Sequence, residues 1–210
     1  MWPKNSTLNV VFIDGTTEQK AVVKRYAPLW TENSSLQLAF FDSLAHAPKY
    51  SHIRISFQSH TGSILGNHGD LVDQAPTLQL AELNRLSLES ERAKRLILHE
   101  FGHALGFEHE FRNPLWPYQY SPIEKQISEC TPRLQAIGFN AQDATIRCRE
   151  INQMLEPELI NATIFDEFSI MNYPLTIPIN RQQNKTIKAT SQLSILDKLA
   201  MERWYGKKTQ

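Results

Sequence analysis

The stretch that decides the fold is His99-Glu100-Phe101-Gly102-His103-Ala104-Leu105-Gly106-Phe107-Glu108-His109-Glu110. His99 and His103 are four residues apart, so on a helix both side chains project from one face, about one turn from each other. Two imidazoles at that separation can bind one small ion. Gly106 can adopt a left-handed conformation, which lets the chain leave the helix and bring His109 back toward the other two histidines. The sequence therefore predicts a three-histidine metal site.

The same stretch carries a candidate general base. Three protein ligands and one open position are typical of catalytic zinc sites, so we expect one Zn²⁺ at this site. Glu100 directly follows a ligand, which places its carboxylate beside the metal, where it can take a proton from water. A helical histidine is usually structural, and the short pattern His-Glu-x-x-His occurs in unrelated proteins. The full eleven-residue pattern arises by chance with a probability on the order of 10⁻⁵ in a chain of this size, which favours a zinc site.

Composition limits the remaining function classes. The chain has 210 residues, 41% of them hydrophobic, which describes one globular domain or two small lobes that share a core. Lys plus Arg and Asp plus Glu both total 22, so no net charge favours nucleic acid or an anionic membrane. The apolar runs are far shorter than the roughly 18 residues that a bilayer span needs. We therefore expect no nucleic-acid partner, no membrane span and a monomer.

The termini and cysteines leave two questions open. Residues 1–5 carry Pro and Lys where a secretory signal needs a long apolar run, so no targeting segment is visible. Either the protein is exported by another route, if at all, or a signal and a pro-segment have been trimmed. Cys130 and Cys148 can form a disulfide or remain thiols, and a bridge would add up to about 3 kcal/mol of stability.

Hydrophobic periodicity and turn signals place the elements. Strands are predicted over residues 8–13, 36–41, 52–57, 63–66 and 77–83. Helices are predicted over residues 16–30, 88–105, 140–155 and 194–204. Residues 67–76 are predicted to form a loop, as are residues 114–132 with a short helix at most. The sequence thus begins with strands and helices and changes at Gly106 to a second half that is rich in helices and loops.

Two motifs together resemble a known family. The extended histidine motif resembles that of the metzincin metallopeptidases, and the Glu110 that follows its third histidine narrows the resemblance to the astacin-like branch. Ser169-Ile170-Met171-Asn172-Tyr173-Pro174 resembles the family's Met-turn. In that turn, the residue equivalent to Met171 forms an apolar floor beneath the zinc histidines. A methionine between apolar residues is otherwise usually part of a core, so the second motif gains its meaning from the first.

The resemblance covers nearly the whole chain and implies an α+β metzincin fold. We expect one catalytic domain over residues 1–210, with a twisted mixed sheet and the zinc helix in an N-terminal subdomain, residues 1–106. A smaller, mainly helical and loop-rich C-terminal subdomain, residues 107–210, is expected across a substrate cleft. The segment Ser63-Ile64-Leu65-Gly66 resembles the edge strand that pairs with an extended substrate.

The resemblance also assigns individual residues. Tyr173 corresponds to a tyrosine that ligates zinc at rest and then hydrogen-bonds the oxyanion, although a buried core tyrosine is the simpler alternative. Glu110 corresponds to a carboxylate behind the metal ligands that meets the freed N-terminus of the mature chain. Asn172 departs from the family, where many members have histidine. Arg181 is a candidate for the basic residue that favours acidic side chains just after the cut.

These expectations combine into a function. The sequence predicts a secreted or exported zinc metalloendopeptidase, with His99, His103 and His109 as ligands and Glu100 as general base and acid. Its partners are expected to be protein or peptide substrates. The alternative is a latent or non-catalytic zinc-containing protein that binds peptides. His68-Gly69-Asp70 has a spacing that some metzincins use for a structural zinc, but a solvated loop histidine is the simpler interpretation.

Overall fold

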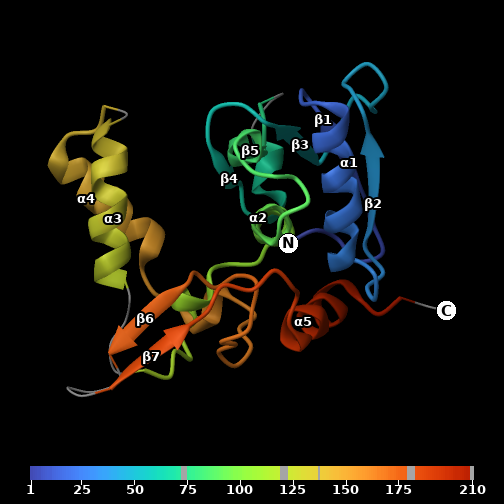
Figure 1. Ribbon diagram of the computed structural model, residues 1–210. Helices are drawn as coiled ribbons and strands as arrows, with labels where there is room; N and C mark the ends of the chain where they lie inside the picture. Colours follow the sequence, from blue (N-terminus) through green and yellow to red (C-terminus); the bar gives the residue numbers. More distant parts are fainter. Residues whose placement is uncertain (72–74, 119–122, 137, 179–182, 209–210) are drawn as a thin grey trace. The chain divides into compact units, whose positions relative to one another are not determined.

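The structure, a computed structural model, describes residues 1–71, 75–118, 123–136, 138–178 and 183–208 (Figure 1). The chain forms two compact units. Unit 1 comprises Met1–Glu108, Ser169–Met171 and Thr190–Gln210, and unit 2 comprises His109–Phe168 and Asn172–Ala189. Unit 1 contains the main sheet and the helix that carries the first two histidines of the motif, so it is described first.

The sheet of unit 1 is mixed and mainly parallel. Its strand order is β2-β1-β3-β5-β4, with β1, β2, β3 and β5 parallel and β4 antiparallel to β5. The strands are β1 (Thr7–Phe12), β2 (Gln37–Phe41), β3 (Ile53–Ser56), β4 (Thr61–Ser63) and β5 (Leu78–Leu80). The strands predicted over residues 8–13, 36–41, 52–57 and 77–83 are confirmed, whereas the strand predicted over residues 63–66 lies earlier in the chain, at Thr61–Ser63, because the chain turns into a 3₁₀ helix at Gly66. β4 lies at one end of this order and is therefore an edge strand among the described residues.

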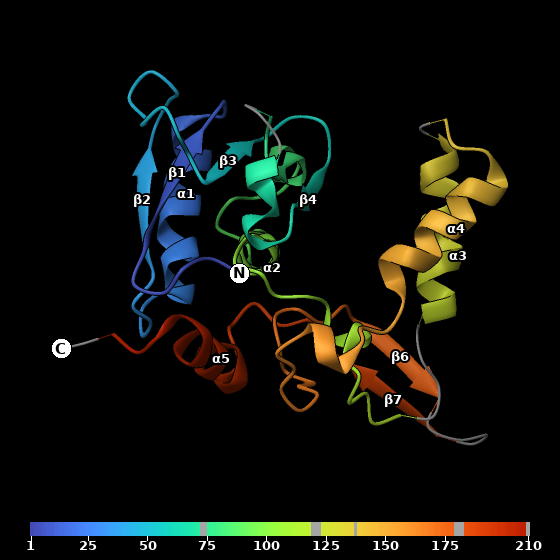
Figure 2. The same ribbon diagram turned by 180° about the vertical axis from the view of Figure 1, so that it is seen from behind.

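Three α-helices belong to unit 1: α1 (Thr17–Tyr26), α2 (Glu91–Ala104) and α5 (Ile195–Tyr205). Each begins at a hydroxyl side chain that accepts from a backbone N–H in the first turn, namely Thr16, Ser90 and Ser194. In Figures 1 and 2, α1 lies beside β1 and β2. Short 3₁₀ helices occupy Ala27–Trp30, Gly66–Leu71 and Ala81–Asn84.

Two buried tryptophans anchor α2 within the core of unit 1. The indole Nε1 of Trp30 donates to the carbonyl of Leu98 at 2.8 Å, and that of Trp2 donates to the carbonyl of Ala104 at 2.8 Å. Both side chains are at most 5% exposed. Each indole therefore combines a large buried apolar surface with a satisfied N–H, which fixes the helix at two points along its length.

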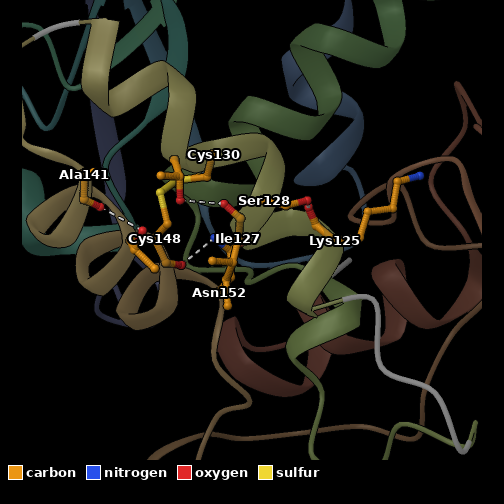
Figure 3. The surroundings of a disulfide bond; sticks show 9 residues. Lys125, Ile127, Ser128, Cys130, Ala141, Cys148 and Asn152 are labelled. Atoms are coloured by element: carbon orange, nitrogen blue, oxygen red, sulfur yellow. Dashed lines mark hydrogen bonds between the residues drawn. A yellow bond between two sulfur atoms is a disulfide. The ribbon is translucent and has the colours of Figure 1, made fainter.

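Unit 2 contains a disulfide-linked pair of helices, α3 (Ile123–Ala136) and α4 (Ala141–Asn152), which lie side by side in both views. Figure 3 shows the bond between Cys130 and Cys148, whose Cα atoms are 5.8 Å apart. Beside it, the Asn152 amide donates to the Cys148 carbonyl at 2.7 Å. The helix predicted over residues 140–155 is confirmed, and the cysteines are paired.

The sequence did not predict α3 as a helix of this length. Residues 114–132 contain several prolines, which disfavour a helix interior, and Pro132 lies inside α3. The covalent link to α4 and the burial of Ile127 compensate for this local cost. Unit 2 also contains an unpredicted antiparallel pair, β6 (Leu175–Pro178) and β7 (Asn184–Ile187), and 3₁₀ helices at Glu110–Arg112 and Pro157–Leu159.

The β6–β7 pair forms one wall of a small core in unit 2. Its buried members are Phe111, Leu175, Ile177 and Ile187. The sequence analysis missed these strands because both are short. In addition, Pro174 directly precedes β6, and β6 itself ends at a proline, a residue that disfavours strands. Among the described helices, none combines the length and the apolar character needed to cross a bilayer.

Candidate active site

Helix α2 positions the first part of the site. His99 and His103 lie one turn apart with their ring centroids 4.9 Å apart, and the rings meet edge to face. His99 and Glu100 are both buried, with 5% and 8% of their surface exposed. The apolar neighbours Ile97, Leu98 and Phe101 are fully buried, which sets the rotation of the helix about its axis.

Backbone carbonyls orient both imidazoles. Nδ1 of His99 lies 2.9 Å from the carbonyl oxygen of Ile170, and Nδ1 of His103 lies 2.8 Å from that of Phe107. Because a carbonyl oxygen can only accept, each Nδ1 carries the proton and donates. The lone pair is then on Nε2, which is the arrangement of metal-binding histidines whose other nitrogen is held by a carbonyl.

The turn after α2 follows the prediction made for Gly106. This residue has a φ of +96°, in the left-handed region that favours glycine. The N–H of Phe107 donates back to the carbonyl of Gly102 at 2.9 Å. This closure also places the Phe107 carbonyl where it holds His103.

The three histidines of the motif form a group that could hold a metal ion. His99, His103 and His109 each offer one nitrogen, and these atoms all lie within 4.8 Å of one another. Burial lowers the pKa of His99 to about 3, with a smaller contribution from the charge of His103, so His99 is neutral at neutral pH. Neutral imidazoles that present Nε2 as a donor are the ligands that zinc accepts, so these residues fit a zinc ion.

Glu100 has a buried carboxyl group, one of whose oxygens makes no hydrogen bond to the described residues. Its Oε2 has no hydrogen-bond partner among the described residues. Burial, with a smaller contribution from the charge of Glu82, raises the pKa of Glu100 to about 8. A buried polar atom without a partner is costly, which makes Oε2 a position where water, substrate or an ion is expected to bind.

Met171, the methionine of the predicted Met-turn, packs against α2 at Gly102. A Cβ added at Gly102 would lie 2.3 Å from the sulfur of Met171 and 2.9 Å from Trp30. Gly102 is therefore the residue that lets Met171 approach the helix between the two histidines. Gly102 is part of the histidine motif, but the motif alone did not predict this packing role.

Asp197 is a further residue that the sequence analysis missed. Its carboxylate accepts from the Ser169 hydroxyl at 2.7 Å and from the Ile170 N–H at 3.0 Å. The Met171 N–H then donates to the Ser169 hydroxyl oxygen at 3.0 Å. Asp197 thus fixes the turn whose carbonyl orients His99. Its only visible sequence signal was the Ser-x-x-Asp spacing of a helix start.

In unit 2, His109 lies within a group of aromatic rings. Its ring centroid is 4.6 Å from that of Tyr173 and 5.0 Å from that of Phe111. Tyr173 is half-buried and packs against the small core of unit 2. Glu110 accepts from the Asn113 amide and from the Asp166 N–H, both at 3.2 Å, and so braces the turn that carries His109.

The predicted substrate strand lies at the sheet edge but begins earlier than expected. Within the predicted segment, Ser63 ends β4, and the Ile64 N–H extends the ladder by donating to Thr77 at 2.8 Å. Gly66 has a φ of +51° and begins a 3₁₀ helix. Leu65 lies between the two. Arg181 lies outside the described residues.

Comparisons with known proteins support the fold. No protein-family model and no curated protein sequence matches the chain. Among solved structures, two of myroilysin are 22% and 23% identical, with TM-scores of 0.75 and 0.67. The matches cover 99% and 97% of this chain and 96% and 85% of those chains. High choriolytic enzyme 1, a hatching-enzyme zinc protease from the medaka fish Oryzias latipes, is 17% identical, with a TM-score of 0.56 over 97% of this chain and 93% of its own. The chain therefore has the astacin-like metzincin fold that its two motifs predicted.

Proposed function

We propose that this chain is a zinc-dependent endopeptidase that hydrolyses peptide bonds in proteins and peptides. The observation that carries the proposal is the three-histidine group next to the buried, unpaired oxygen of Glu100. The similarity of the fold to that of a hatching-enzyme zinc protease supports it.

His99, His103 and His109 would hold the metal ion. A bound zinc would lower the pKa of water to about 7 and polarise the carbonyl of the scissile peptide bond. The carbonyls of Ile170 and Phe107 keep two of the imidazoles in the tautomer that has its lone pair on Nε2. The sulfur of Met171, which lies close against Gly102, would form the apolar floor under these rings.

Glu100 would move the proton. Its unpaired Oε2 would accept a proton from the attacking water and then pass it to the nitrogen of the leaving amine. Its raised pKa, about 8, makes the protonated form easy to reach near neutral pH, as a carboxyl that shuttles a proton requires. Positive charge from a bound ion would lower this pKa and favour the base form before attack.

Tyr173 would stabilise the oxyanion. A phenol that donates a hydrogen bond to developing negative charge lowers the barrier to acyl transfer. Its ring packs 4.6 Å from that of His109, which supports a place close to the ligand set. Glu110 would act behind the ligands by holding the turn that carries His109.

The substrate would bind as an added strand. In β4 and its continuation, Ser63, Ile64, Leu65 and Gly66 would pair with an extended peptide through main-chain hydrogen bonds. We further propose that residues 1–210 act as one catalytic domain, as a monomer, on exported substrates. The Cys130–Cys148 disulfide supports an oxidising compartment. The alternative, a latent or non-catalytic peptide-binding protein, is less favoured because Glu100 is retained and unpaired.

The test is cleavage of casein, an unstructured protein, by the purified chain. We expect cleavage by the wild type, its loss after chelation and its return with added zinc. Glu100→Gln should retain zinc and lose at least a hundredfold in rate. Glu32→Gln, an exposed carboxylate in the same unit, is the matched control and should retain the rate. An unchanged rate in Glu100→Gln would exclude this mechanism.

A further inference from the structure

Unit 1 contains a second concave site outside the histidine group. It is a cavity of about 660 Å³ that is lined by Phe57, just after the end of β3, by Thr61 at the start of β4 and by Arg92 in the first turn of α2. The carboxyl ends of parallel strands are where open sheets of this kind usually bind ligands. None of the residues assigned above to the metal or to the proton transfer lines this cavity.

The charged residues that line the cavity carry a net positive charge. Arg85 and Arg92 both line the cavity, and Glu82 is its only carboxylate. Arg92 forms an ion pair with Glu82, so these two charges offset each other. Within the described part of the chain, the guanidinium of Arg85 forms no hydrogen bond or ion pair with another residue. One uncompensated guanidinium suits a ligand with a single negative charge, such as a carboxylate.

Hydrogen bonds join the cavity wall to the start of β4. The N–H of Glu82 donates to the Thr61 hydroxyl oxygen at 3.0 Å, and the N–H of Ala81 donates to the His60 carbonyl at 3.1 Å. The His60 ring lies against the strand, since a Cβ added at Gly62 would be 3.5 Å from it. A peptide paired with the edge of β4 would therefore pass this cavity as it leaves the strand.

The strand also leads from the cavity toward the catalytic half of α2. The segment after β4 reaches Gly66, where an added Cβ would lie 3.4 Å from the Cα of Gly106, just beyond the end of α2. Arg92 is in the first turn of that helix, and Glu100 is eight residues further on. Eight residues of helix span about 12 Å, the length of three to four residues of extended peptide.

We propose that this cavity binds the carboxylate of an acidic residue in a peptide that lies against β4, three to four residues from the bond that is cut. The inference rests on the proposed function for the position of the cut, and it assigns a substrate class to the same enzyme. Arg85 is the group that selects the carboxylate, and Arg92, held by Glu82, forms part of the wall.

The first experiment measures binding without turnover. The probes are fluorescein-labelled ten-residue peptides of alternating Thr and Ala, each with a single Glu, Gln or phosphoserine at one position in turn. They are titrated with the zinc-loaded Glu100→Gln chain and followed by anisotropy. We expect Glu to bind about tenfold more tightly than Gln at one position, as one charge-assisted hydrogen bond provides, and the difference to fall at high salt.

The Arg85→Gln change in the same background should reduce the Glu-to-Gln ratio to about one. Arg203→Gln is the matched control, because Arg203 is an exposed arginine of the same unit that does not line the cavity. Both arginines are exposed, so both variants should fold, which circular dichroism checks. Equal binding of Glu and Gln at every position would overturn the proposal. So would a ratio unchanged by Arg85→Gln, or tighter binding of phosphoserine than of Glu.

The second experiment separates this inference from the proposed function. With the active chain, the preferred Glu peptide should show a KM about tenfold lower than its Gln counterpart, with kcat unchanged, and Arg85→Gln should abolish the difference. A binding preference without any cleavage would overturn the proposed function and leave the cavity assignment standing. Cleavage with no preference for Glu at any position would overturn the cavity assignment alone.

Discussion

Asp197, in the first turn of α5, accepts a hydrogen bond from the Ile170 N–H at 3.0 Å. The carbonyl of that same Ile170 lies 2.9 Å from Nδ1 of His99. A buried carboxylate almost a hundred residues away in sequence therefore sets the orientation of the first imidazole of the three-histidine group. Outer partners of this kind are typically needed for full metal affinity.

Replacing Asp197 by Asn should weaken zinc binding. An amide offers one acceptor where the carboxylate uses both oxygens, so the turn that ends in Met171 loses a hydrogen bond. We expect zinc affinity to fall about 10- to 100-fold and unfolding to become easier by about 1–3 kcal/mol. Competition with a chelator measures the first effect and urea unfolding the second. Asp143→Asn, at the same position in the first turn of α4, is the control and should leave zinc affinity unchanged.

Replacing Gly102 by Ala should strain the packing beneath the histidines. The new Cβ would meet the Met171 sulfur at 2.3 Å, so the side chain below must move. We expect a loss of about 1–3 kcal/mol in the free energy of unfolding. Gly62→Ala is the control, because its nearest neighbour is at 3.5 Å, an ordinary contact.

A double-mutant cycle identifies the cause of that loss. If Met171 is the clashing group, Met171→Ala should recover part of the stability lost in Gly102→Ala. Strictly additive losses in the two variants would contradict the packing described for Gly102 and Met171.

The metal-free protein should lose stability as the pH rises. The pKa of Glu100 is raised from 4.5 to about 8 by burial, so the folded state holds this proton more tightly than the unfolded chain does. The contribution is fully present below pH 4.5 and is lost as the pH rises to 8. Compared with Glu100→Gln, the wild type should lose on the order of several kcal/mol across that window, about 1.4 kcal/mol per pH unit.

Urea unfolding of both chelated proteins at several pH values measures this difference. Added zinc should reduce it, because a cation near the carboxylate lowers its pKa. Parallel pH profiles for the metal-free wild type and Glu100→Gln would show that Glu100 is not buried as the structure describes.

Reducing the disulfide should loosen one part of unit 2. The bond between Cys130 and Cys148 closes a loop between residues separated by 18 positions, which is worth about 3 kcal/mol in the unfolded chain. We expect faster hydrogen exchange in α3 and α4 after reduction, with little change in α2. The Cys130→Ala, Cys148→Ala double variant controls for effects of the reductant elsewhere. Equal loss of protection in α2 would contradict a local role for the bond.

Much of unit 1 could be predicted because the sequence patterns that indicate its helices and strands each lie within a short stretch of the chain. Hydroxyl caps, period-two strands and the left-handed Gly106 each fit within a few residues, and β1, β2, β3, β5 and α2 were predicted from them. The motif also placed His99, His103 and His109 in one group, which the structure brings within 4.8 Å.

The remaining features depend on contacts that a local pattern does not contain. Helix α3 was predicted as a loop because Pro132 lies inside it and other prolines precede it, and it is stabilised by a covalent bond to another helix. Asp197 reads as a helix-start residue, and its bonds to Ser169 and Ile170 join segments far apart in the chain. The cavity at Arg85 is lined by residues from separate strands and a helix, so no periodic pattern in the sequence indicated it.

The most direct measurement of the central claim is a titration of the zinc-free protein with zinc, following casein cleavage. The three-histidine group predicts that the rate rises linearly and reaches a plateau at one zinc per chain, and that Glu100→Gln takes up the same zinc without gaining the rate. Full cleavage by the zinc-free protein, or one bound zinc per chain with no cleavage by the wild type, would contradict the account.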